Sequence, residues 1–531
     1  MARLTVRSGR GEEALTFQPG ATLRQILAAG TAPVRAGCRG FGACGLCRVR
    51  VLDGPAGEPS PAERLHLGQE GLAGGLRLAC QVTPQDDLTI LLLAPASRPA
   101  WRALAGPELP QPPTAVPVPG LPAGRALGAV VDLGTTHLSL AVYDLAQGRG
   151  LAGRRGPNPQ AGAGADVVTR LVAAAASEQA ARDLGGQVVA AVGEALEDLA
   201  AREGLDLGRL GRLLLVGNTP MLALLTGQEP ARLLCPDAWE GAADAAPGDP
   251  AAWATAWGLA PGAQVEVVPP LAGFAGSDIL AGCLAARLET RDGPALLVDF
   301  GTNTEIALWD GATLWVTSAA GGPAFEGSGL GCGLPAGEGA IHRVEAGEQG
   351  LTWQVLGGGP PQGFCGSGLV DLVAVLLDTG RLTPRGKFTA PGPADRVALV
   401  PARPELALTK RDVDLFQQAK AAVGAGVALV CSLAGLAPGE LRRVVVAGSF
   451  GCHLNPASAQ RIGLLPPMPV EAVELAGNTA LAGAAQLLLT AEAPARAARL
   501  RAATRQVNLA RAECFEDLYL DNLFLQPMKG R

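Results

Sequence analysis

The sequence is poor in aromatic residues, in histidine and in clustered basic charge. Aromatic residues make up 4% of the 531 residues, whereas glycine alone contributes 72, so helices are expected to pack closely. The chain has four histidines, and none is spaced for a catalytic triad or for haem ligation. The formal net charge is −6 and no block of Lys and Arg occurs, which argues against a nucleic-acid partner.

Targeting and membrane-spanning patterns are also missing. No run of 18 or more apolar residues free of charges and helix breakers occurs, so no membrane span and no membrane partner are expected. The N-terminal stretch MARLTVRSGRGEEALTF has no apolar segment typical of a signal peptide and predicts two strands around a turn. Hydrophobic residues still make up 48% of the chain, which suffices for buried cores, and the length predicts two to four domains.

Four of the eleven cysteines form a spaced group near the N-terminus. Cys38, Cys44 and Cys47 follow a C-x5-C-x2-C pattern in CRGFGACGLC, and Cys80 lies further on in RLACQV. Three clustered thiolates with a distant fourth are typical of a ferredoxin loop around a [2Fe–2S] cluster. The glycines between them permit positive φ angles and turn backbone N–H groups toward the sulfurs. These four cysteines are therefore the predicted metal ligands.

Tetrahedral zinc is the alternative, since four cysteines also suit it. Zinc ribbons use two C-x2-C knuckles, however, and only Cys44 and Cys47 have that spacing. The first gap exceeds the plant-type spacing by one residue and resembles the adrenodoxin-type variant. The other cysteines are scattered without metal-like spacing, which predicts buried thiols in a reducing cytosol and a cytoplasmic protein: Cys235, Cys283, Cys332, Cys365, Cys431, Cys452 and Cys514.

Residues 1–95 are predicted to form the ferredoxin unit. The strand-like LTVRS and LTFQ precede a short helix, TLRQILAAG, with Thr22 as N-cap, and the helical PAERLHLG and the strand DLTILLL follow the cysteine loop. This order resembles the β-grasp ferredoxin fold, an α+β domain. Residues 96–124 are dense in proline, which predicts an extended, semi-rigid linker on which the ferredoxin unit swings.

Residues 125–292 and 293–531 alternate strands and helices, which predicts two α/β lobes. The segments ALGAVVDLGTTHLSLAVYD and ALLVDFGTNTEIALWDG each read as a strand, an Asp-x-Gly-Thr turn and a second strand. Such a repeat predicts a duplicated fold with two lobes facing a cleft. The turn exposes N–H groups, its glycine lets a phosphate approach, its threonine adds a hydroxyl, and its aspartate can hold Mg²⁺.

A third motif, RRVVVAGSFG, is a buried strand that ends in Gly448-Ser449-Phe450-Gly451. Alone it would also suit an ordinary strand-to-helix turn. With the two Asp-x-Gly-Thr turns it resembles the phosphate-1, phosphate-2 and adenosine motifs of the acetate and sugar kinase, Hsp70 and actin superfamily, whose lobes are ribonuclease H-like. The residues expected to serve ATP and Mg²⁺ are the carboxylates Asp132, Asp299 and Glu305 as catalytic groups, with Gly134, Thr135, Thr136, Gly301, Thr302, Asn303, Gly448, Ser449 and Gly451 as nucleotide contacts.

The whole chain resembles the reductive activators of corrinoid proteins. Beyond the motifs above, the resemblance rests on NPQAGAGADVVTRL, VGNTPMLALLTG, PPLAGFAGSDILAG, SAAGGPAFEGSGLGCGLPAGEGAI, GFCGSGLVDLVAVLL, KRDVDLFQQAKAAV, VAGSFGCHLNPASAQRIGLLP and GNTALAGA. It implies ATP-dependent reduction of Co(II) to Co(I) in a corrinoid methyl-transfer protein, with a low-potential electron donor and with a homodimer left open. The family's helix near the adenine implies Gln417 and Lys420 as further contacts. Gly276 and Asp278 offer a turn and a carboxylate that suit either magnesium or helix capping.

Three other functions remain open on the residues alone. A ferredoxin-fused small-molecule kinase would need a substrate base between the lobes. An ATP-driven activator of a non-corrinoid enzyme would use the same electron carrier. A redox-sensing binding module would need no ATP turnover, and the intact Asp-x-Gly-Thr turns argue against it.

Overall fold

A computed structural model describes most of the chain: residues 2–8, 11–28, 30, 34, 47–93, 101–112, 126–239, 245–289, 293–327, 329–348, 350–389, 396–400 and 403–529. Two compact units result, one of residues 1–102 with 156–191 and the other of residues 103–155 with 192–531. The predicted cluster ligands Cys38 and Cys44 lie outside the described residues.

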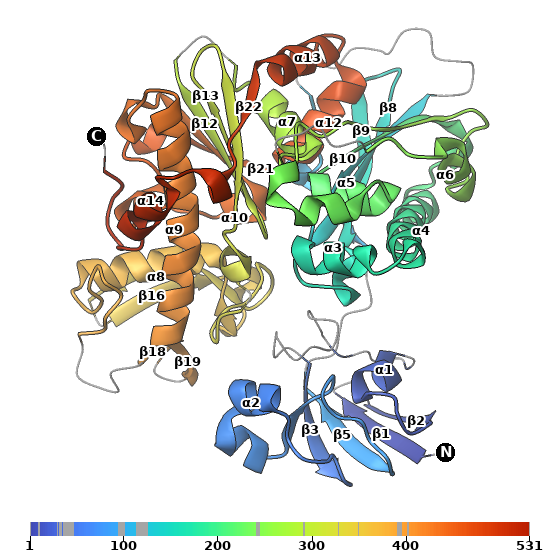
Figure 1. Cartoon of the computed structure of the whole chain (residues 1–531), viewed down its shortest axis with the longest axis vertical. Coiled ribbons are helices and arrows are strands. Elements are labelled where there is room, and N and C mark those ends of the chain that lie inside the picture. Colours follow the sequence, from blue (N-terminus) through green and yellow to red (C-terminus); the bar gives the residue numbers. More distant parts are fainter. Residues whose placement is uncertain are drawn as a thin grey trace. The chain divides into compact units, whose positions relative to one another are not determined.

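The N-terminal sheet has five strands in the order β2-β1-β5-β3-β4 (Figure 1). Its elements are β1 (Ala2–Ser8), β2 (Gly11–Phe17), α1 (Leu23–Ala28), β3 (Arg48–Asp53), α2 (Pro61–Ala73), β4 (Leu76–Leu78) and β5 (Leu88–Leu92). Thr22 caps α1 as predicted, because its backbone N–H donates to Gln25 Oε1 at 2.8 Å while its Oγ1 accepts from Gln25 N at 3.4 Å. The order of hairpin, helix and closing strand confirms the predicted β-grasp ferredoxin fold.

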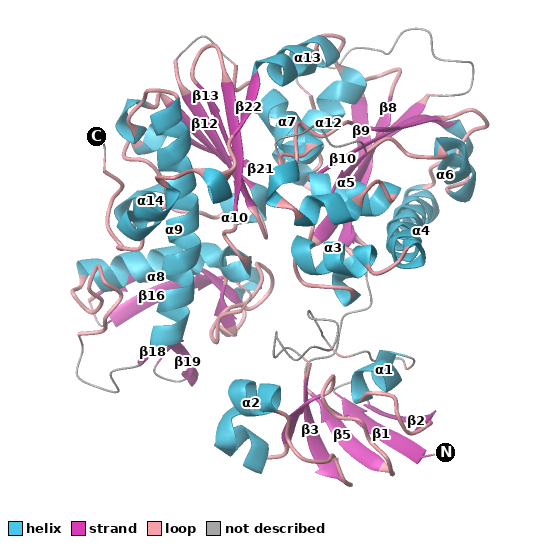
Figure 2. Cartoon of the chain, viewed as in Figure 1, coloured by secondary structure: helices cyan, strands magenta, loops and turns pink. Residues whose placement is uncertain are grey.

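The first α/β lobe is built on a six-stranded sheet in the order β11-β10-β7-β8-β9-β6. Figure 2 labels β8, β9 and β10 of this sheet, drawn in magenta. Its strands are β6 (Arg102–Ala103), β7 (Leu127–Leu133), β8 (His137–Asp144), β9 (Arg149–Pro157), β10 (Leu210–Gly217) and β11 (Gln264–Val267). β7 and β8 form the antiparallel hairpin predicted around the first turn, and β10 and β11 run parallel to β7. The carboxyl ends of β7, β10 and β11 therefore share one edge of the sheet.

The second lobe repeats this arrangement in the order β21-β20-β12-β13-β14-β22. Its strands are β12 (Ala295–Phe300), β13 (Thr304–Trp309), β14 (Leu314–Ala319), β20 (Arg443–Ala447), β21 (Val473–Gly477) and β22 (Thr504–Gln506). The hairpin β12–β13 surrounds the second turn, while β20 and β21 run parallel to β12. The predicted duplication is thus confirmed strand by strand.

Helices α7 (Ser277–Ala285) and α12 (Thr479–Leu489) lie side by side and join the two lobes (Figure 1). They share one buried core with apolar residues from both six-stranded sheets. At the helix crossing, a Cβ on Gly483 would lie 1.8 Å from the Ala281 carbonyl oxygen, so only glycine permits this approach. The two lobes are consequently one packed body at this core.

Part of the proline-rich stretch is packed, in contrast to the extended linker predicted for it. Residues 101–112 include β6 at the sheet edge, and Leu104 N donates to Gly153 O at 3.0 Å. Tyr143 Oη donates to Pro110 O at 3.1 Å. Apolar residues between the prolines explain the difference, since an edge strand needs few ladder hydrogen bonds and tolerates neighbouring proline. The boundaries 96 and 124 remain a prediction.

The C-terminal lobe carries further elements around its sheet: β15 (Ala340–Gly347), β16 (Gly350–Val355), β17 (Gly363–Phe364), α8 (Gly366–Asp378), α9 (Lys410–Leu433), α10 (Gly448–Gly451) and α14 (Phe515–Asn522). Among the described helices, α9 alone is long and apolar enough to cross a membrane, but 78% of its apolar window is buried inside the fold, as in a core helix. The thiols of Cys283, Cys332, Cys365 and Cys431 are buried as predicted, whereas Cys235, Cys452 and Cys514 are exposed.

Candidate functional site: a cysteine turn and a two-lobed nucleotide site

Two predicted cluster ligands lie in adjacent segments of the ferredoxin sheet. Cys47 directly precedes β3 and Cys80 follows β4, and they are 1% and 5% exposed. Ala79 N donates to Cys47 O at 2.8 Å, which ties the two segments together. Gln81 Nε2 donates to Cys80 Sγ at 3.5 Å, a bond of the kind that tunes cluster potentials. Two buried thiols on segments joined by this backbone hydrogen bond suit a [2Fe–2S] cluster, and the assignment of Cys38 and Cys44 as its other two ligands stays a prediction.

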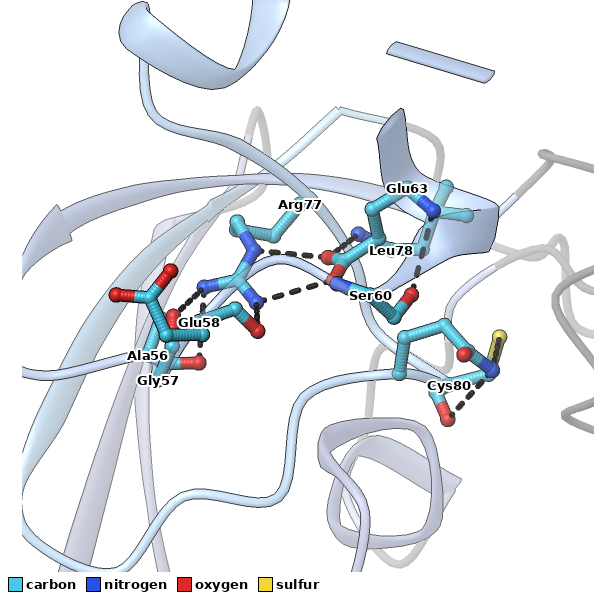
Figure 3. Close-up of polar contacts among 9 residues, drawn as sticks. Ala56, Gly57, Glu58, Ser60, Glu63, Arg77, Leu78 and Cys80 are labelled. Carbon is cyan, nitrogen blue, oxygen red and sulfur yellow. Dashed lines mark hydrogen bonds and ion pairs between the residues drawn. The ribbon is translucent and has the colours of Figure 1, made fainter. Parts of the chain in front are cut away.

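A buried ion pair supports the Cys80 segment, and the sequence reasoning missed it (Figure 3). Glu63 is fully buried, and its Oε1 and Oε2 accept from Arg77 Nε at 2.8 Å and Nη2 at 3.1 Å. Glu63 also accepts from Leu78 N at 2.9 Å and Ser60 N at 2.8 Å. Burial alone would raise the pKa of Glu63, but these hydrogen bonds and the Arg77 charge hold that pKa below its ordinary value.

The two Asp-x-Gly-Thr turns close in similar ways and meet. Gly134 N donates to His137 O and Gly301 N donates to Asn303 O, each at 3.0 Å. The hydroxyls of Thr136 and Thr302 lie 2.7 Å apart, although 166 positions separate them in the chain. The structure therefore brings both predicted phosphate turns to one place at the junction of the lobes.

Four carboxyl groups gather around these turns: Asp132, Asp278, Asp299 and Glu305. Burial raises the pKa of Asp132 to about 6. Burial, followed by the charges of Asp278 and Asp132, raises the pKa of Asp299 to about 8. Burial and the neighbouring carboxylates also raise the pKa values of Asp278 and Glu305. This mutual repulsion favours a cation between the groups.

Magnesium bound together with a nucleotide fits this arrangement. Among the residues that the structure describes, no three His, Cys, Asp or Glu side chains come close enough to hold a metal ion on their own. Mg²⁺ usually binds one or two carboxylates together with substrate phosphates and waters, so it does not need such a cluster. The described carboxylates can thus serve a Mg²⁺ ion that a triphosphate also ligates.

The third predicted motif joins the second turn. Gly448 has φ +85°, and a Cβ there would lie 2.2 Å from Phe300 O and 2.9 Å from Asp299 Oδ1. A Cβ on Gly451 would lie 2.9 Å from Val446 O. Only glycine allows the chain to pass so close to the Asp299 carboxylate. The side chain of Ser449 lies outside the described part of the chain.

Both residues that the family resemblance implies as adenine contacts donate hydrogen bonds to the C-terminal segment. Gln417 Nε2 donates to Leu523 O at 2.7 Å, and Lys420 Nζ donates to Asn522 O at 2.8 Å and to Phe524 O at 2.9 Å. Burial lowers the pKa of Lys420 to about 7. Because α14 packs along α9, these two side chains anchor the C-terminal segment, and their role as adenine contacts stays a prediction.

The structure adds polar groups that the sequence reasoning did not assign. Asn478 Nδ2 donates to Asp132 Oδ2 at 2.7 Å, and Asn218 Nδ2 donates to Thr135 Oγ1 at 3.1 Å. The recurring Gly-Asn-Thr string was the available signal for both asparagines. Arg155 Nη2 lies 3.3 Å from His137 Nδ1, and the charge of Arg155 works against the burial that raises the pKa of Asp132.

Comparisons with known proteins agree with this architecture. The family model described as the C-terminal domain of RACo, the ASKHA domain, matches residues 293–530, and the model of the RACo middle region matches residues 127–291. The model of the 2Fe-2S iron-sulfur cluster binding domain matches residues 7–85. These matches confirm the predicted ferredoxin and actin-like folds and the predicted cofactors, a [2Fe–2S] cluster and ATP with Mg²⁺.

Individual relatives extend over much of the chain. The corrinoid activation enzyme RamQ of Eubacterium limosum is 29% identical over 425 residues, which cover 74% of this chain and 70% of the relative. The Co(II) methylated amine-specific corrinoid protein reductase of Methanosarcina barkeri is 27% identical over 250 residues, or 43% of this chain and 44% of the relative. A solved structure of a reductive activator for corrinoid, iron-sulfur protein matches with a TM-score of 0.66 at 25% identity, over 99% of both chains.

Proposed function

Because the chain belongs to the RACo family through its middle and C-terminal domains, we propose that it uses ATP to drive the reduction of a corrinoid protein from Co(II) to Co(I). One observation carries this proposal. The same chain combines the two buried cysteines of the ferredoxin unit, Cys47 and Cys80, with the paired phosphate turns at Thr136 and Thr302. The relatives named for corrinoid activation and reduction support it.

The ferredoxin unit holds the electron carrier. Its bound [2Fe–2S] cluster supplies one electron at a time, at roughly −400 mV for plant-type ferredoxins. Cys47 and Cys80 anchor the site, the Glu63–Arg77 pair fixes the segment before Cys80, and the Gln81 amide faces the Cys80 sulfur. One electron lost by this unit and one gained by cobalt balance the step.

The nucleotide site offsets the energetic cost of the transfer. Transferring one electron to an acceptor whose reduction potential is about 59 mV lower than that of the donor costs about 1.4 kcal/mol. A difference of a few hundred millivolts would therefore leave almost no reduced product. ATP can shift this equilibrium only if the nucleotide states differ in affinity for the corrinoid partner. Asp132, Asp299 and Glu305 lie at the lobe junction, where Mg²⁺·ATP would bias the relative position of the lobes.

The proposal implies partners on both sides of the electron path. The acceptor is a corrinoid methyl-transfer protein, and a low-potential donor protein recharges the ferredoxin unit. We place the reaction in the cytoplasm, and a homodimer is an assembly to be tested by size-exclusion chromatography with light scattering.

The decisive experiment measures Co(I) spectrally under anaerobic conditions, with a chemical reductant and a panel of Co(II) corrinoid proteins, with and without ATP. Mg²⁺·ATP should raise the extent of Co(I), and the variant Asp299→Asn should abolish this gain while keeping the cluster spectrum. Equal Co(I) with and without ATP across the panel would overturn the proposal. ATP turnover that depends on an added small molecule would instead identify a kinase.

A further inference from the structure

Two asparagines in matching Gly-Asn-Thr strings reach the same phosphate turn. One string, residues 217–219, begins at the last residue of β10, and the other, residues 477–479, begins at the last residue of β21. Each asparagine is the N-cap of the next helix, where its Oδ1 accepts from the backbone N–H three residues on, at 3.0 Å for Asn218 and 2.7 Å for Asn478. The cap assigns the orientation of each amide, because the oxygen must face its own helix.

The Nδ2 group of Asn478 is therefore left to point away from α12. It donates to Asp132 Oδ2 at 2.7 Å and approaches Ser139 Oγ at 3.5 Å. Asp132 and Ser139 are paired across β7 and β8, so the amide contacts both strands of the first hairpin. The bond to Asp132 is charge-assisted, which makes it stronger than a bond between neutral groups.

The two asparagines differ in which lobe they belong to. Asn218 donates to Thr135 Oγ1 at 3.1 Å within the first lobe. Asn478 belongs to the C-terminal lobe and lies 346 positions from Asp132 in the chain. It is carried by α12, which shares the interlobe core with α7, and the first turn of α7 carries Asp278. A movement of the C-terminal lobe on the first would thus act directly on the Asp132 carboxylate.

We propose that Asn478 is a positioning residue through which the C-terminal lobe holds the Asp132 carboxylate in place for Mg²⁺·ATP. The inference deepens the nucleotide half of the proposed function and rests on it. ATP hydrolysis is then fast only while α12 keeps the amide within hydrogen-bond reach of Asp132. Lobe opening releases the carboxylate, so the position of the lobes controls the rate of ATP hydrolysis. This control does not require Asn478 to contact the nucleotide.

The first test is the variant Asn478→Ser, compared with the matched variant Asn218→Ser. Serine retains an N-cap acceptor but removes the amide donor. Basal ATP turnover is measured with Mg²⁺ and without any corrinoid protein, so a failure of the corrinoid proposal leaves this test valid. For Asn478→Ser we expect kcat to fall about tenfold to a hundredfold, the range for a hydrogen bond to a charged group, with a smaller rise in KM. Asn218→Ser loses a bond between neutral groups, so its kcat should fall less than tenfold.

Two double variants separate positioning from a general loss of structure. In Asp132→Asn, adding Asn478→Ser should cause no further loss of kcat, because the amide acts through that carboxylate. The second double variant, the reciprocal pair, combines Asp132→Asn with Asn478→Asp. The new carboxylate at position 478 still caps α12, and it accepts a hydrogen bond from the new amide at position 132. The melting temperature of the reciprocal pair should exceed that of Asn478→Asp alone, in which two carboxylates face each other.

The outcomes are distinct. Wild-type kcat and KM in Asn478→Ser would overturn the proposal, as would a full multiplicative loss on top of Asp132→Asn. If Asn478→Ser proves unstable, the reciprocal pair decides, and a pair no more stable than Asn478→Asp would also overturn it.

Discussion

Replacing Glu63 with glutamine should release the segment that carries Cys80. The Glu63 carboxylate accepts four hydrogen bonds, two of them from Arg77 and one each from Ser60 N and Leu78 N. Glutamine has one acceptor oxygen and adds an NH₂ donor that would face other donors. The Arg77 charge would remain buried, with backbone carbonyls of residues 56–58 as its described partners.

The expected loss is large for a domain of this size. Removing one partner of a buried ion pair costs about 3–5 kcal/mol, and Glu63 is 0% exposed while Arg77 is 6% exposed. Each kcal/mol shifts the melting temperature of a 60–100-residue domain by roughly 4–8 °C. The ferredoxin unit of Glu63→Gln should therefore unfold at a temperature at least roughly 12 °C lower than that of the wild type.

The assay follows the visible absorbance of the cluster in the full-length protein during heating, because that signal reports on the ferredoxin unit alone. Glu70→Gln, at an exposed glutamate beyond the kink of α2 at Gly68, is the matched control and should leave the bleaching temperature unchanged. The pKa of Glu63 is depressed in the folded state, so its contribution is present above the unfolded value of about 4.3 and lost as the pH falls through the folded value. Bleaching at the same temperature in both variants would refute the argument.

Four further predictions concern the two cofactor sites. Cys80→Ser should change the reduced cluster's paramagnetic resonance signal and lower its iron content, and an unchanged signal would exclude Cys80 as a ligand. Gln81→Leu should lower the reduction potential, measured by a spectroscopic redox titration, because the bond to the Cys80 sulfur stabilises the reduced form. Asp299→Asn should cut ATP turnover by orders of magnitude and leave the iron signal intact. Unchanged hydrolysis in both Asp299→Asn and Asp132→Asn would refute a role of the two paired turns in ATP hydrolysis. The pKa of Asp299 is raised to about 8, and the pKa of Glu305 is also raised. The contribution of these two groups to the free energy of unfolding is therefore full below their unfolded pKa of about 4, and it is lost as the pH rises through their folded pKa values. The melting temperature in a chelator should accordingly fall from about pH 5 to about pH 9, and added Mg²⁺·ATP should reduce that fall.

Local pattern was enough for the parts of this protein in which a few neighbouring residues dictate the conformation. The hairpins around Asp132 and Asp299 were predictable because an apolar strand followed by Asp-x-Gly-Thr has few alternatives. The end of the apolar strand β20 at a glycine was also predictable, and α10 begins there at Gly448. Compositional reasoning failed at residues 101–112, because proline content does not reveal that Leu104 would find Gly153 at a sheet edge.

The helix that carries Gln417 and Lys420 shows what local pattern leaves open. Helix α9 was correctly predicted, but the direction of two side chains depends on where α14 packs, more than a hundred residues later. The exposure of Cys235, Cys452 and Cys514 was misjudged for a similar reason, since burial is a property of the packed structure.

Short-range sequence patterns dictate the cofactor chemistry, because cysteine spacing and glycine-containing turns act over a few residues and tolerate few alternative conformations. How that chemistry is held in place depends on the packing of the whole fold. The pairing of Glu63 with Arg77 and of Asn478 with Asp132 joins residues whose separation in the chain carries no signal of contact. Such pairs form when apolar cores bring distant elements together, and buried polar groups must then find the partners that the packing offers.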